Sequence, residues 1–284
     1  MVKTKLFPSF WMAVLLVLAC IAAELTVGVL LGAMCLLASW LFGLSPHAFN
    51  ILTKACEALT ALTVFGVVIL LHSLLAKPPL RRYLSLSQLT PRRLAAMAVM
   101  VPGLAILLSE ADNLTRWILP MPAFLARIFE SLFNTPALSL LLLVVVAPLT
   151  EEFVFRGIIL RGLLSRYSMR TAVLLSALIF ACGHLNPYQF LSALILGLVA
   201  GWVFAATESL SLCMVIHALN NFLAWFVGCG LLGIEISGLT FTSFDDVSFQ
   251  PWWLDLAGLC LAVFGLFLLT STIREAFADR CPQL

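Results

Sequence analysis

The segment that decides the fold reads ALSLLLLVVVAPLTEEFVFRGIIL and covers residues 137–160. It is long enough to cross a bilayer as a helix, which takes about 20 predominantly apolar residues. Its second half nevertheless carries Glu151, Glu152 and Arg156. Ionisable side chains are costly inside a membrane and by default mark a functional site there. The segment therefore predicts a membrane helix that carries polar chemistry.

The rest of the chain has the composition of a membrane protein. Of its 284 residues, 62% are hydrophobic and 11% are charged, and the mean hydropathy is +1.09. A soluble domain carries about 25% charged residues, so this chain could not cover a soluble surface with polar groups. The net charge of +2 provides no basic field of the kind that attracts nucleic acid. We expect the bilayer, and no nucleic acid, as a partner.

Eight apolar segments are candidates for membrane spans, and the third and fifth of them are short. The prediction is an all-α polytopic bundle in which residues 1–284 form one membrane domain. An amphipathic interfacial helix is predicted at Leu114–Phe133, where charges are spaced among apolar residues. The eight predicted spans are Phe10–Cys35, Cys56–Leu75, Leu94–Ser109, Ala137–Leu160, Thr171–His184, Phe190–Ala206, Leu210–Gly228 and Trp252–Thr272.

The N-terminal apolar run and the cysteines each have two possible interpretations. Lys3 and Lys5 before the apolar run resemble a signal peptide, but the run continues to about Phe42. A cleaved signal has an apolar region of about 7–15 residues, so a retained first membrane helix is favoured. The eight cysteines contain no CxxC pair and fall mostly in apolar runs. They are interpreted as small buried apolar residues rather than as disulfides or a metal site.

The distribution of Lys and Arg predicts that both termini are cytoplasmic. Twelve of the 16 Lys and Arg residues fall on one side if the spans alternate from an inner N-terminus. The loop Cys229–Pro251 has acidic residues but no Lys or Arg, so it is expected outside. A bacterial inner membrane is the expected location. The twelve are Lys3, Lys5, Lys77, Arg81, Arg82, Arg92, Arg93, Arg161, Arg166, Arg170, Arg274 and Arg280.

Three predicted spans carry polar motifs at similar depths. These are EEFVFR at residues 151–156, FACGH at residues 180–184 and HALNN at residues 217–221. A rise of 1.5 Å per residue, counted from the nearest inner charge on each helix, places the polar groups roughly 14–21 Å deep. We therefore expect the three helices to bring them into one slab of the membrane.

The spacing within each motif suggests different roles. Glu152 and Arg156 are four residues apart on one helix face, where Arg156 can neutralise Glu152. Glu151 lies about 100° round the helix and is free to take a proton from water. Pro148 removes a backbone donor beside them and is expected to bend the helix.

The histidines and the asparagine suggest substrate polarisation. His184 and His217 can polarise or protonate a substrate or hold a metal. Asn221 shares a face with His217, and its amide suits a developing oxyanion. Glu24, in the first span, has no evident partner and is assigned no role.

Small-residue pairs suggest where helices approach one another. Gly28 and Gly32, and Gly197 and Gly201, lie one turn apart and are interpreted as packing contacts.

In order and spacing, the three motifs resemble those of the CPBP family, which comprises the CAAX prenyl endopeptidases and bacteriocin-processing enzymes, also called type II CAAX or ABI proteases. The resemblance covers residues 137–228, which would be the catalytic core. It implies an eight-helix intramembrane endopeptidase that opens to the cytosol and cuts a membrane-anchored protein or peptide, prenylated or not. By analogy Glu151 and His184 would activate water, His217 and Asn221 would stabilise the oxyanion, and Glu152 and Arg156 would support the site.

The need for a metal and two other functions stay open at this point. Glu151, His184 and His217 could hold a catalytic Zn²⁺ with water as the fourth ligand. They do not form the HExxH arrangement, so a reaction without a cofactor is favoured. A non-catalytic scaffold or immunity protein would keep the same polar groups as a buried structural core. A proton-coupled transporter is less favoured because the chain shows no repeated halves.

Overall fold

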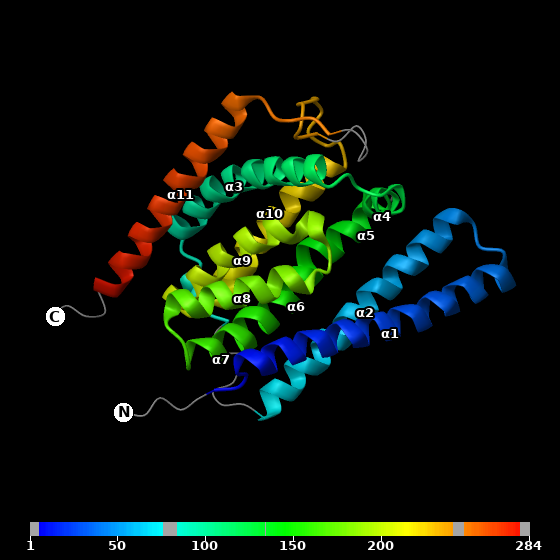
Figure 1. The fold of residues 1–284 in the computed structure, drawn as a ribbon, viewed down its shortest axis with the longest axis horizontal. Coiled ribbons are helices and arrows are strands. Elements are labelled where there is room, and N and C mark those ends of the chain that lie inside the picture. The colour runs from blue at the N-terminus through cyan, green and yellow to red at the C-terminus, as the bar shows by residue number, and fades with distance from the viewer. Residues whose placement is uncertain (1–5, 76–83, 134, 241–246, 279–284) are drawn as a thin grey trace.

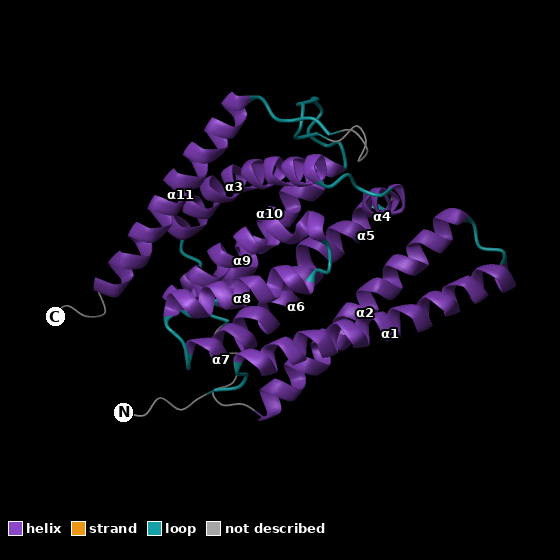
Figure 2. Ribbon diagram, in the orientation of Figure 1, coloured by secondary structure: helices purple, strands orange, loops and turns teal. Residues whose placement is uncertain are grey.

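The computed structural model describes residues 6–75, 84–133, 135–240 and 247–278, and its regular elements there are all helices (Figure 2). The all-α class is therefore confirmed. Part of the topology prediction falls on residues outside the described ranges. Those residues are Lys3, Lys5, Lys77, Arg81, Arg82 and Arg280 among the inner charges, and Asp245 and Asp246 in the outer loop.

Each predicted span corresponds to a helix or to a run of helical segments. In the described residues, seven helices are long and apolar enough to cross a membrane. The eighth, α8, has only 15 residues, fewer than the roughly 20 that a full span needs. The chain is thus an integral, multi-pass membrane protein. Its long helices are α1 (Phe10–Phe42), α2 (Pro46–Leu75), α3 (Pro91–Ile118), α9 (Pro187–Thr207), α10 (Leu210–Gly228) and α11 (Trp252–Ala278), and α8 is Met169–Gly183.

The fourth span is a continuous helix of mixed type from Pro136 to Leu164. Two π-helical stretches interrupt its α-helical hydrogen bonding. Its parts are α5 (Pro136–Leu140), η3 (Leu141–Val146), α6 (Ala147–Glu152), η4 (Phe153–Leu160) and α7 (Arg161–Leu164).

The predicted interfacial helix at Leu114–Phe133 is wrong in its first half. Residues up to Ile118 continue α3, and α4 is a separate helix at Ala123–Phe133. The charge of Arg116 is accommodated inside the bundle, where its Nη2 donates to Asn113 Oδ1 at 2.6 Å. The chain leaves the helix only before Pro120 and Pro122, because proline disfavours helical geometry in the residue that precedes it.

The helices form a bundle with a distinct pair on each flank (Figure 1). The α1–α2 hairpin lies on one flank, and α3 pairs with α11 on the other. The mixed helix, α8, α9 and α10 lie between them. The start of α1 and the end of α11 lie at the same end of the bundle, as an even number of crossings requires.

Glycines permit the closest helix contacts, but not at every predicted place. A Cβ at Gly265 of α11 would lie 2.4 Å from Met100 N of α3. A Cβ at Gly197 would lie 3.1 Å from Ala177 Cα, as the packing interpretation of that pair predicts. Gly28 and Gly32 meet nothing within 4 Å. Their interpretation as a packing contact is wrong, because they face a cavity between α1 and α2.

Candidate active site

The site begins at the irregular backbone of the mixed helix. In a π-helix each N–H reaches the carbonyl five residues back, and Ala147 N–H bonds Leu142 O in this way. The next carbonyl, that of Leu143, would be paired with residue 148, but Pro148 has no N–H. Asn221 of α10 takes its place and donates Nδ2–H to Leu143 O at 2.9 Å. The predicted disturbance at Pro148 is therefore a π-helical stretch. Its carbonyl at Leu143, which lacks a backbone donor, is hydrogen-bonded by a side chain from another helix.

Asn221 thus has a structural task beside the catalytic one suggested by the sequence. One of its two amide hydrogens is directed at Leu143 O. An oxyanion would have to use the second hydrogen of that amide.

A buried ionic network holds Glu152. Its side chain has 0% exposure, and Oε1 accepts hydrogen bonds from Arg156 Nη1 at 2.8 Å and from His217 Nδ1 at 2.8 Å. The guanidinium of Arg156 lies 4.6 Å from the ring centroid of Phe180, and its Nη2 approaches Gly197 O at 3.4 Å. The predicted pairing of Glu152 with Arg156 is confirmed. The network links the mixed helix to α8, α9 and α10.

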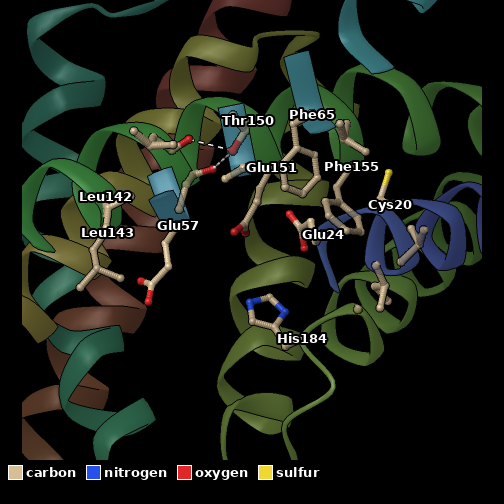
Figure 3. Close-up of a pocket in the computed structure, with 17 residues that line it drawn as sticks. Cys20, Glu24, Glu57, Phe65, Leu142, Leu143, Thr150, Glu151, Phe155 and His184 are labelled. Atoms are coloured by element: carbon tan, nitrogen blue, oxygen red, sulfur yellow. Dashed lines mark hydrogen bonds between the residues drawn. The ribbon is translucent and has the colours of Figure 1, made fainter. Parts of the chain in front are cut away.

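Glu151 points the other way, into a cavity of about 370 Å³ (Figure 3). Its side chain is 21% exposed. The atom Oε2 is buried and has no hydrogen-bond partner among the described residues. His217 Nε2 lies 4.0 Å from this oxygen. His217 therefore stands between the two glutamates, bonded to Glu152 and facing Glu151.

His184 reaches the same cavity from the end of α8, where it is the residue that caps the helix. Its Nδ1 donates to Phe180 O at 2.9 Å, which fixes the ring and leaves Nε2 available. Figure 3 shows the imidazole directed into the space beside Glu151. The close contact of Phe180 with both the Arg156 guanidinium and the His184 ring ties this end of α8 to the ionic network.

Two further carboxylates line this cavity that the sequence motifs did not include. Glu24 of α1 directs its carboxylate towards Glu151 (Figure 3), and the two interact electrostatically. Glu57 of α2 also lines the cavity and pairs with Lys54 at 2.8 Å. The only sign of Glu24 in the sequence is that it is an acidic residue inside an apolar span. Only the fold reveals that it faces the residues of the fourth span.

Glu151, His184 and His217 are the candidate zinc ligands. Two imidazoles and a carboxylate are suitable donors for zinc, and among the described residues neither ring uses Nε2 in a hydrogen bond. The described residues nevertheless contain no group of three His, Cys, Asp or Glu side chains placed to hold a metal ion.

One comparison with known proteins gives a match. No curated protein and no solved structure is significantly similar to the chain. Residues 133–223, about a third of the chain, match the family described as type II CAAX prenyl endopeptidase Rce1-like. The matched region includes all three polar motifs and extends from the end of α4 into α10. The resemblance drawn from those motifs is confirmed, since the region that carries all three of them matches the Rce1-like type II CAAX prenyl endopeptidase family.

Proposed function

We propose that the chain is an intramembrane endopeptidase that hydrolyses a peptide bond of a membrane-associated protein or peptide. The observation that carries this proposal is the separation of two adjacent glutamates. Glu152 is held in a dry ionic network, whereas Glu151 faces a cavity together with His184. A carboxylate and an imidazole beside one cavity are the groups that activation of water requires.

In the proposed reaction Glu151 removes a proton from a water molecule in the cavity. The resulting hydroxide attacks the carbonyl carbon of the substrate, and the carbonyl oxygen becomes an oxyanion. The proton then passes to the nitrogen of the leaving amine as the carbon–nitrogen bond breaks. His184 orients the water through Nε2, since Nδ1 is held by Phe180 O.

His217 and Asn221 are the proposed oxyanion donors. His217 would donate from a protonated Nε2, the atom that faces Glu151. Asn221 would donate its second amide hydrogen, since the first is used by Leu143 O. Glu152 and Arg156 act as positioning residues, because Glu152 accepts from Nδ1 of His217 and so sets the ring orientation.

Residues 137–228 form the catalytic core of a single membrane domain, and the cavity opens towards the cytosol of a bacterial inner membrane. In the proposed reaction no metal takes part, and Glu151 acts directly on water.

Replacement of the proposed base tests this function. Glu151→Gln keeps the shape of the side chain but removes the base, and should slow cleavage by about 10²–10⁴-fold. The substrate panel would be fluorogenic peptides anchored in liposomes either by a farnesylated cysteine or by a single apolar helix. Glu130→Gln, at an exposed position on α4, is the matched control. Wild-type rates for Glu151→Gln would rule out the proposed base. Loss of cleavage after treatment with a chelator, reversed by added Zn²⁺, would rule out the metal-free reaction.

A further inference from the structure

Two cysteine side chains meet between α1 and α2. Cys35 Sγ of α1 lies 3.4 Å from Cys56 Sγ of α2. The two sulfur atoms of a disulfide are about 2.05 Å apart, so a small movement of the side chains would bring them to bonding distance. We propose that Cys35 and Cys56 are a redox-active pair, which an external disulfide oxidises to an intramolecular disulfide that fixes α1 to α2.

The pair borders a second cavity, which lies between α1 and α2 and has a volume of about 430 Å³. Polar side chains of Thr53, Glu57 and Thr60 also line this cavity. Cys56 is partly exposed and Cys35 is buried. An oxidant that enters the cavity would therefore meet Cys56 first.

The length of the hairpin places the two thiols near the water on the side of its turn. A helix of 33 residues is about 50 Å long, well beyond the roughly 30 Å of hydrocarbon in a bilayer. Cys35 lies seven residues before the end of α1 at Phe42, a distance of about 10 Å along the axis. The excess length allows this part of the hairpin to lie at or beyond the edge of the hydrocarbon, where a water-soluble disulfide can approach.

The proposed oxidation is two successive thiol–disulfide exchanges. Cys56 loses its proton to water, and its thiolate attacks the sulfur–sulfur bond of the oxidant, which releases one thiolate and leaves a mixed disulfide. Cys35 then loses its proton, and its thiolate attacks the Cys56 sulfur and releases the second thiolate. The two cysteines lose two electrons in total, and one molecule of oxidant is reduced to two thiols.

The disulfide would restrain one wall of the active-site cavity. Glu57 follows Cys56 directly in α2 and lines both cavities, as Glu24 of α1 also does. A covalent bond between the two helices beside Glu57 would fix their separation at this point. The inference does not depend on the proposed proteolysis, because it concerns only the chemistry of the two thiols.

Oxidised glutathione, added to the full-length protein in liposomes, tests the inference. After free thiols are alkylated, mass spectrometry of the digested protein should show a cross-link between the peptides of Cys35 and Cys56. Both positions should be lost from the alkylated pool. Cys229, a partly exposed thiol directly after the end of α10, serves as the control and should carry only a glutathione adduct.

Two serine variants separate the exchange steps. Cys35→Ser should leave Cys56 trapped as its glutathione adduct, and Cys56→Ser should leave Cys35 as a free thiol. The inference is overturned if wild-type Cys35 and Cys56 both remain alkylatable while Cys229 is modified. It is equally overturned if wild-type Cys56 accumulates as the adduct with no cross-link to Cys35.

Discussion

At the scale of single residues, Glu151 and Glu152 are neighbours in sequence with opposite surroundings. A step of one residue turns a helix by about 100°, which is enough to direct one carboxylate into the ionic network and the other into the cavity. Glu152 has 0% exposure and accepts from Arg156 and His217 through Oε1, whereas Glu151 is 21% exposed and lines the cavity. Their replacement should consequently affect stability in one case and chemistry in the other.

Glu152→Ala should destabilise the protein by about 3–5 kcal/mol, because Arg156 would remain buried without its counter-ion. The free energy of unfolding in mixed detergent micelles measures the effect. Glu275→Ala is the control, since it breaks the Arg92–Glu275 pair, whose side chains are 82% and 61% exposed. Exposed pairs contribute little, so this variant should unfold like the wild type. Equal stability of Glu152→Ala and the control would contradict the importance of the buried network.

At the scale of helices, the hydrogen bond from Asn221 to Leu143 O is one of the links between the mixed helix and α10. Asn221→Ala removes the donor to Leu143 O and should cost about 1–3 kcal/mol. Pro148→Ala should recover part of this loss in the double variant, since the new backbone N–H can reach the same carbonyl in the π-helical register. A double-mutant cycle of unfolding free energies measures the coupling. Purely additive effects of the two substitutions would show that Pro148 and Asn221 are not linked in this way.

The same double variant separates the two tasks of Asn221. If the amide only closes the π-helix, cleavage should recover together with stability. If its second hydrogen also stabilises the oxyanion, cleavage should stay slow in the variant whose stability has recovered. We expect the second result, which would show a direct role in the reaction.

The contact between α3 and α11 gives a further prediction at this scale. A Cβ at Gly265 would lie 2.4 Å from Met100 N, so Gly265→Ala must push the two helices apart and should cost about 1–3 kcal/mol. Gly28→Ala is the matched control, because a Cβ there meets nothing within 4 Å. The unfolding free energies of the two variants measure the difference. If both variants unfold alike, this glycine does not set the distance between α3 and α11.

The helices themselves could largely be predicted from the sequence, because apolar length alone identifies a membrane span. The pairing of Glu152 with Arg156 followed from helical periodicity in the same way. The π-helical stretch η3 could not be predicted, since the carbonyl of Leu143 in it is bonded by Asn221, which lies 78 residues later in the chain. The extent of α3 was missed because Arg116 looked like an interfacial charge and its partner Asn113 is visible only in the fold.

At the scale of the whole molecule, the site is larger than the part of the chain that carries its motifs. The family match covers residues 133–223, yet α1 and α2 close the cavity and contribute Glu24 and Glu57. Hydropathy identifies these two helices but does not say which face of the bundle they cover. The position of Glu24 opposite Glu151 is therefore a result of tertiary packing.

The arrangement of the whole bundle leads to a test of its orientation. The start of α1 and the end of α11 lie at one end of the molecule, and α7, with its basic residue Arg161, ends there as well (Figure 1). Loops rich in Lys and Arg remain in the cytoplasm. We therefore predict that alkaline phosphatase fused after α11 stays inactive, whereas the same enzyme fused after Gly230 is exported and active.

Fluorescent-protein fusions at both positions provide the control, since they should give the opposite pattern. Active phosphatase at the C-terminus would show that the bundle has the opposite orientation. The cavity of Glu151 would then face away from the cytosol, and the proposed access of substrate from the cytosolic side would be wrong.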